Sequence, residues 1–333
     1  MTARSAPPAR TIPRWVWHTA IGLSIGAVSA WLTLRQAVPR AAIDAIMRVD
    51  PAWLAAAVPP YALALATRVL RWRTLVGHLA TLSYGTFARV MVLAHGINLL
   101  LPVRLGELFR IETFKRKYGV PRAWTGSSMM IERMLDIVTV VVCLSTGLLV
   151  AATPPDRLLI ALSSMGGALF CILCTALVLL VWLARQPWVR RWRYAHRHLT
   201  MIGPALQVMG NRAFAVAVAA TLGISALETA ALVAVLHALG VEVTPGLALV
   251  VLGAAGLSTF LPAAPGFVGT YQYAFLLAVT QFGVDGALGV AAATLVQLVL
   301  FGPVAAAALA ILALGARLYW QFSPTVSARP TSS

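Results

Sequence analysis

The sequence has 333 residues, of which 60% are hydrophobic and 11% charged, and its mean hydropathy is +0.84. A soluble domain cannot bury that much apolar surface, so the composition excludes a soluble globular protein and indicates a membrane protein. The net charge of +16 is better explained by cytoplasmic loops rich in Lys and Arg than by nucleic-acid binding.

Apolar runs follow one another along the whole chain, and several approach the roughly 20 residues that cross a bilayer as a helix. The first is interpreted as a span rather than a signal peptide, because it is long and lacks a small-residue cleavage site. Tryptophans such as Trp53 and Trp72 are expected at the interface, near span ends. The runs cover 15–34, 52–70, 86–103, 125–150, 158–184, 213–237, 246–262, 266–282 and 287–316.

Two of these apolar regions are interrupted by proline and glycine and are not predicted to be simple spans. Proline removes an amide donor and disrupts a helix, so 86–103 and 246–282 are each predicted to form a broken or re-entrant hairpin. The residues that break them are Pro102 and Gly106 in the first region, and Pro262, Pro265, Gly266 and Gly269 in the second.

Charge supports this topology. If the amino terminus is cytoplasmic and both hairpins return to their side of entry, 21 of the 26 Lys and Arg residues fall in cytoplasmic segments and four in outer segments. This is a strong positive-inside signal, and it supports the assumed topology with both termini in the cytoplasm. The cytoplasmic segments are 1–14, 68–89, 104–123, 185–212 and 317–333.

An internal repeat extends the prediction to the fold. When the chain is shifted by 160 residues, AHGINLLLPVRLGEL (94–108) aligns with AAGLSTFLPAAPGFV (254–268), sharing five identities and a P-x-x-x-G break. We therefore predict an all-α polytopic membrane protein with an inverted repeat, 15–150 and 158–316. Each half has three spanning helices and one hairpin, and the tails 1–14 and 317–333 are cytoplasmic. Such inverted repeats are typical of transporters.

Charged residues cluster just beyond the first break. Arg104, Glu107 and Arg110 are spaced by three, so they share one face of a helix. They are expected to line a wet cavity, because broken backbone inside a membrane needs protein or water around it. The alternative is a solvated cytoplasmic helix, which is the interpretation favoured for 115–117.

A second cluster lies in MIERMLDIV, residues 130–138. Glu132 and Asp136 project from one helix face, with Arg133 beside them, and charges within a span usually face a bundle interior. We predict that they pair with the Arg104–Arg110 segment, although such a pair can be purely structural. The alternative is that the span begins only after Asp136.

The second hairpin is uncharged, with Gln272 among its polar residues. Glu228 is a further acid inside a span, either protonated and hydrogen-bonded or titrating. His95 is interpreted as an interfacial or packing residue. We expect no metal site and no cofactor, since catalytic and metal-binding motifs are missing and Cys171 and Cys174 lack partner ligands.

Three ordered motifs resemble the lysylphosphatidylglycerol synthase transmembrane family of flippase-like proteins. They are NLLLPVRLGELFR (98–110), IERMLD (131–136) and LPAAPGFVG (261–269). The resemblance implies similarity to the membrane half of an aminoacyl-phospholipid synthase-flippase, which moves a modified lipid between leaflets. Other members accompany polyprenyl-linked sugar or hopanoid pathways. The tail from Arg317 onward has only 17 residues, so aminoacyl transfer is not expected. Many relatives also have an acidic residue where this chain has Gln272.

The sequence therefore predicts a lipid transporter. Arginines would hold a phosphate, because guanidinium pairs with its oxygens, and the acids would position them. The alternatives are a lipid-modifying enzyme with Glu132 and Asp136 as acid and base, or a scaffold for lipid-biosynthesis proteins. The expected partners are membrane lipids and not nucleic acid; the oligomeric state stays open. The predicted headgroup-binding residues are Asn98, Arg104, Glu107, Arg110, Glu132, Arg133, Asp136 and Gln272.

Overall fold

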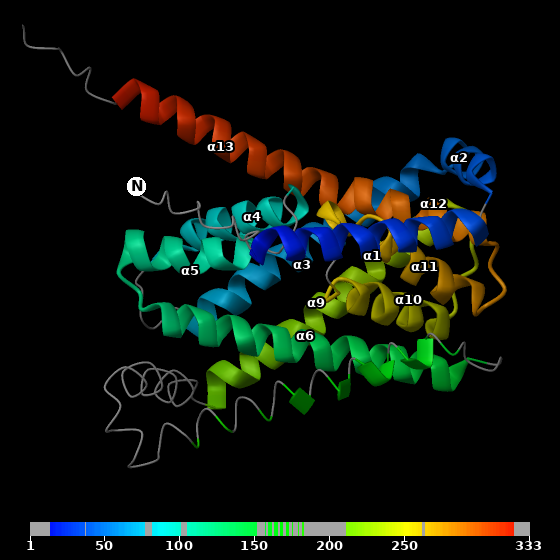
Figure 1. Ribbon diagram of the computed structural model, residues 1–333, viewed down its shortest axis with the longest axis horizontal. Helices are drawn as coiled ribbons and strands as arrows, with labels where there is room; N and C mark the ends of the chain where they lie inside the picture. Colours follow the sequence, from blue (N-terminus) through cyan, green and yellow to red (C-terminus); the bar gives the residue numbers. More distant parts are fainter. Residues whose placement is uncertain are drawn as a thin grey trace, which may run out of the picture.

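The structure is a computed structural model, and its described residues form helices without strands (Figure 1). It describes residues 14–36, 38–76, 82–100, 105–151, 211–261 and 264–322, together with isolated positions between 157 and 182. The predicted all-α membrane class is confirmed.

The helices follow the apolar runs of the sequence. The first half contains α1 (Arg14–Gln36), α2 (Pro39–Met47), α3 (Pro51–Val76), α4 (Tyr84–Leu100), α5 (Leu105–Tyr118) and α6 (Arg122–Val150). The second contains α9 (Asn211–Ala238), α10 (Pro245–Ser258), the short helix η3 (Pro265–Phe267), α11 (Thr270–Thr280), α12 (Gly286–Val296), the π-helix η4 (Gln297–Phe301) and α13 (Gly302–Phe322).

Among the described residues, four helical stretches are long and apolar enough to cross a membrane: 51–76, 122–150, 212–238 and 286–314. They match four of the predicted spans. The run at 15–34 is helical as α1, whereas most of 158–184 lies outside the described residues, as do 1–13 and 323–333 of the predicted tails.

The first hairpin forms from α4 and α5, which lie antiparallel. Gly106 at the start of α5 packs on Ala94 near the end of α4, while Phe114 and Phe87 meet at the other end with ring centroids 5.1 Å apart. The prediction placed the whole hairpin within 86–103. That boundary was wrong, because the returning arm is α5, which had been assigned to a cytoplasmic loop.

The second hairpin forms from α10 and α11 over the predicted range. Gly246 at the start of α10 lies against the ring of Phe282 just after α11, so these two helices are also antiparallel. Between them, Gly266, Phe267 and Gly269 have φ values of 66°, 60° and 90°. This left-handed backbone suits the two glycines and strains the phenylalanine.

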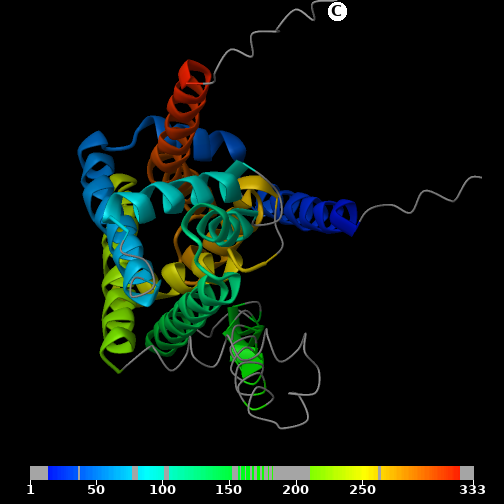
Figure 2. The same cartoon turned by 90° about the vertical axis from the view of Figure 1, so that its left-hand side faces the viewer.

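Helices of each half of the chain pack against helices of the other half. Helices α3 and α9 run antiparallel, since the Asp50 amide donates to the Ala238 carbonyl (2.9 Å) and Arg71 reaches Thr221. The first helix of each hairpin lies on a long helix of the opposite half, α4 on α13 and α10 on α6. In Figure 2 the gold second hairpin accordingly lies between α9 and α1.

Candidate functional site

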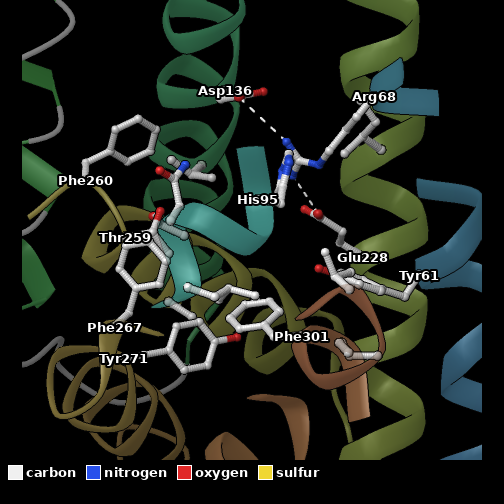
Figure 3. Close-up of a pocket in the computed structure, with 18 of the residues that line it drawn as sticks. Tyr61, Arg68, His95, Asp136, Glu228, Thr259, Phe260, Phe267, Tyr271 and Phe301 are labelled. Carbon is white, nitrogen blue, oxygen red and sulfur yellow. Dashed lines mark hydrogen bonds and ion pairs between the residues drawn. The ribbon is translucent and has the colours of Figure 1, made fainter. Parts of the chain in front are cut away.

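A cavity of about 230 Å³ lies where the two hairpins meet the spanning helices. The hairpin breaks adjoin it, and a Cβ on Gly266 would lie 3.6 Å from the carbonyl oxygen of Leu99 at the end of α4. One wall carries charged and polar side chains and the other is aromatic (Figure 3). The polar lining comprises Tyr61, Arg68, His95, Asn98, Glu107, Arg110, Arg133, Asp136, Ser225, Glu228, Thr259 and Tyr271.

A chain of buried charges begins in the polar wall with Arg110 and Asp136 and includes Arg71 and Glu132 behind it. The Nη2 atom of Arg110 donates to Glu132 Oε2 at 2.9 Å, and Arg71 Nε lies 3.8 Å from the other oxygen of the same carboxylate. Arg71 then donates to both Asp136 oxygens, at 2.6 and 3.2 Å. Each of these charges has lost hydration by burial, and its neighbours of opposite charge compensate for that loss. Removal of one group would therefore leave its partner buried without a counter-charge.

Aromatic side chains support this chain of charges from the other side. The guanidinium of Arg110 lies 3.9 Å from the ring centroid of Trp72, a cation–π contact. Trp72 is fully buried and packs edge-on against Phe87, at 5.0 Å between centroids. Trp72 therefore lies in the protein core, because α3 continues through residue 76, and its position near the membrane interface stays a prediction.

Arg68 connects three helices at the cavity wall. From α3 it donates to Glu228 Oε1 on α9 at 2.6 Å, and its Nη1 atom lies 3.8 Å from Asp136 on α6. The side chains of Arg68 and Glu228 are 22% and 23% exposed, and both line the cavity, whereas Arg110 lines it but its partner Glu132 does not. Figure 3 shows the Arg68 side chain between the two carboxylates.

Arg133 is the cavity cation with the longest contacts. Its Nε atom lies 3.6 Å from Glu107 and its Nη1 atom 3.7 Å from Asp136, both beyond good hydrogen-bond distance. The Nε atom is buried and has no hydrogen-bond partner among the described residues. This guanidinium therefore retains donors that an entering anion can use.

The opposite wall is formed by the second hairpin and η4. Tyr271 and Phe301 meet at a steep angle with ring centroids 5.8 Å apart, and Phe301 also faces Tyr61 across 6.3 Å. Phe267 places its ring in the lining from its left-handed backbone. Strained residues and π-helical turns often occur at functional sites, and here both adjoin the cavity.

The structure brings most of the predicted site together. Asn98, Glu107, Arg110, Arg133 and Asp136 line the cavity, and the predicted pairing of the two charged segments is confirmed by the Arg110–Glu132 and Arg133–Glu107 contacts. Asn98 also fixes the first hairpin, because its Oδ1 atom accepts the Gly106 amide at 2.8 Å. Arg104, Pro102 and Pro262 lie outside the described residues.

Two predicted residues do not reach the lining. Glu132 is buried behind it. Gln272 holds the second break together: its Oε1 atom accepts the Gly269 amide at 2.7 Å, and its amide nitrogen donates to Gln297. Gln297 in turn donates to the Gly266 carbonyl at 3.1 Å.

Sequence reasoning missed Arg68 and Arg71, which were counted among the basic residues of a cytoplasmic loop, and it treated His95 as a packing residue although His95 lines the cavity. A signal for the arginines was present. The acidic residues predicted inside the membrane outnumbered the basic residues predicted to pair with them. In addition, Arg68 lies 160 residues before Glu228, which is the offset of the repeat.

Comparison with known families identifies the family of this chain. The family described as "Lysylphosphatidylglycerol synthase TM region" matches residues 19–308, from α1 into α13. The chain belongs to this family. Curated proteins give no match. Membership of the lysylphosphatidylglycerol synthase TM family fits a membrane protein that acts on lipids.

Proposed function

We propose that this protein moves a polar-headed lipid, of the phospholipid, polyprenyl-linked or hopanoid type, between the leaflets of the bacterial inner membrane. The observation that carries this proposal is the charged cavity between two broken hairpins, in a bundle with four helices long enough to span a bilayer. Ionisable groups inside a membrane are costly and usually mark a path for polar cargo.

The size of the cavity supports a headgroup as its occupant. Its volume of about 230 Å³ is below the range of roughly 300–1,000 Å³ for sites that enclose a drug-sized ligand. The headgroup would enter this space, while the acyl or prenyl tails remain in the bilayer. Exposed leucines such as Leu63 and Leu298 on the outer faces of the helices leave the protein surrounded by lipid.

Arg133 is the residue best placed to bind a lipid phosphate. It lines the cavity, and its Nε atom has no hydrogen-bond partner among the described residues. Guanidinium binds phosphate oxygens through paired hydrogen bonds. Glu107 and Asp136 flank it and would hold it in place until the phosphate arrives. Arg110, bound to Glu132 and stacked on Trp72, supports the wall.

The packing also supports an inverted repeat, with the hairpins entering from opposite faces and both termini in the cytoplasm. Helices α3 and α9 are equivalent under the 160-residue shift and cross antiparallel at Arg68 and Glu228. The exchanged contacts of α4 with α13 and of α10 with α6 follow the same symmetry. Transporters with this symmetry bind cargo near the midplane, where the repeats meet.

Reconstituted protein tests the proposal. Liposomes containing fluorescent phosphatidylglycerol are treated with dithionite, which bleaches only the outer leaflet, so transport exposes the inner pool to bleaching. Wild-type protein is expected to bleach both pools, and Arg133→Gln to lose most of this activity. Arg116→Gln, which removes a guanidinium whose side chain is 79% exposed, serves as the matched control.

The same liposomes distinguish the two alternatives. A lipid-modifying enzyme changes the mass of the lipid, whereas a transporter changes only its leaflet, and a scaffold changes neither. Transport by wild type with unchanged lipid mass supports the proposal. Protein that leaves half of the label protected, as in empty liposomes, contradicts it.

A further inference from the structure

The Arg68–Glu228 pair differs from the other buried ion pairs in the number of alternative charged partners that each of its residues has. Asp136 is held by Arg71 through hydrogen bonds of 2.6 and 3.2 Å and lies near Arg133 as well. Among the described residues, Glu228 has one ion-pair partner, Arg68. Arg68, in contrast, has a second carboxylate within 3.8 Å. Loss of the Arg68 contact would thus leave Glu228 without a cation, whereas Asp136 would keep two.

Further titratable groups line the cavity around Glu228. They include Tyr271 from α11 and Tyr61 from α3. The charged and titratable groups that face Glu228 are Arg68 and Tyr61 on α3, His95 on α4, Asp136 on α6 and Tyr271 on α11.

We propose that Arg68 is an anion ligand of the cavity that exchanges Glu228 for the phosphate of the headgroup, and that Glu228 takes up a proton when this exchange occurs. The inference rests on the proposed transport function and adds to it a second bound species, the proton. It also assigns a binding role to a residue that no sequence motif indicated.

The exchange follows from the cost of an unpaired charge in a membrane. Phosphate offers Arg68 two oxygens, where Glu228 offers one at 2.6 Å, so the guanidinium can pair with it bidentately. The released carboxylate would then be an isolated anion in a poorly solvated site, and such a group neutralises itself by protonation. The proton enters the cavity from the aqueous phase and forms an O–H bond on the carboxylate, so no hydroxide is left behind. One negative charge and one positive charge enter together, and the net charge of the cavity does not change.

Binding of short-chain phosphatidylglycerol to the purified protein in detergent tests this inference. We expect wild type to take up about one proton for each dihexanoyl-phosphatidylglycerol bound, measured by calorimetry in buffers of different ionisation enthalpy. The affinity should then weaken by up to about tenfold for each unit of pH increase over the range in which binding takes up a proton.

Variants of the pair sharpen the test. Glu228→Gln keeps the shape of the side chain but frees Arg68, so it should bind the probe roughly tenfold or more tightly, without proton uptake and without dependence on pH. Arg68→Gln should lose most of the binding. Glu242→Gln removes an exposed carboxylate between α9 and α10 and should behave like wild type.

The results that would overturn this inference differ from those that would overturn the transport proposal. Probe binding by wild type without proton uptake, the same uptake in Glu228→Gln, or no binding at all would overturn the exchange. The wild-type proton count decides the question even if a variant fails to fold. Normal lipid movement without proton uptake would leave transport standing, and coupled binding without lipid movement would defeat transport alone.

Discussion

Substitution of Gly106 by alanine tests the close packing that closes the first hairpin. A Cβ there would lie 2.7 Å from the carbonyl carbon of Ala94 and 2.8 Å from Asn98 Oδ1. The carbonyl oxygen of Ala94 would lie closer still, and ordinary contact begins near 3.4 Å. Helix α5 would therefore have to move away from α4 by more than the 0.7 Å that the carbonyl carbon alone requires. That movement breaks the hydrogen bond between the Gly106 amide and Asn98, which is 2.8 Å long.

The expected loss of stability combines two effects. Overpacking of a tight contact destabilises by about 1–3 kcal/mol, and the lost hydrogen bond adds about 1 kcal/mol. A loss of about 2–4 kcal/mol should lower the Tm by several degrees, measured by thermal unfolding of the purified protein followed by size-exclusion chromatography. It should also reduce lipid movement, because Asn98 and Glu107 line the cavity on either side of this contact.

Gly223→Ala is the matched control, because Gly223 lies in helix α9 and no atom stands within 4 Å of its Cβ position. Alanine is the better helix former, so this variant should be neutral or slightly more stable. A Gly106→Ala protein as stable and active as the Gly223→Ala protein would refute the hairpin packing.

Three other substitutions test the charges and the second break. Glu132→Gln leaves Arg110 without its carboxylate and should destabilise the protein by about 3 kcal/mol, whereas Glu112→Gln, at a half-exposed surface pair, should leave the Tm nearly unchanged; equal effects would contradict the buried network. Gly269→Ala places a Cβ at φ 90° against the Gly26 backbone and should lower the Tm more than Gly283→Ala, which has φ 74° but open space around it; the opposite order would contradict the contact between α1 and the break. Gln297→Leu removes the donor to the Gly266 carbonyl and should destabilise by about 1–3 kcal/mol, which unfolding of the variant checks; an unchanged Tm would show that the amide pair does not hold the hairpin.

Local sequence signals sufficed for the elements that depend on local chemistry. Apolar length predicted the spans, and proline with glycine predicted both breaks, because these residues act on their own backbone. The Arg110–Glu132 pair was also predictable, since each residue lies in a short motif where a charge in lipid demands a partner.

Contacts between helices that are far apart in the sequence were harder to predict. The positive-inside pattern placed Arg68 and Arg71 in a loop, because counting charges cannot tell a loop arginine from one buried by a helix that continues six residues further. Gln272 has a polar side chain beside a break, as a binding residue would. Its partner Gln297 lies 25 residues away on η4, and sequence spacing does not reveal that contact.

The central claim is that a lipid headgroup occupies the cavity between the hairpins. The most direct measurement uses phosphatidylglycerol with a photoreactive diazirine on its headgroup, cross-linked in liposomes and mapped by mass spectrometry. We predict cross-links at Phe267 and Tyr271, which line the cavity, with their loss in Arg133→Gln and on competition by unlabelled lipid. Cross-links confined to lipid-facing residues such as Leu298, and unchanged in Arg133→Gln, would contradict it.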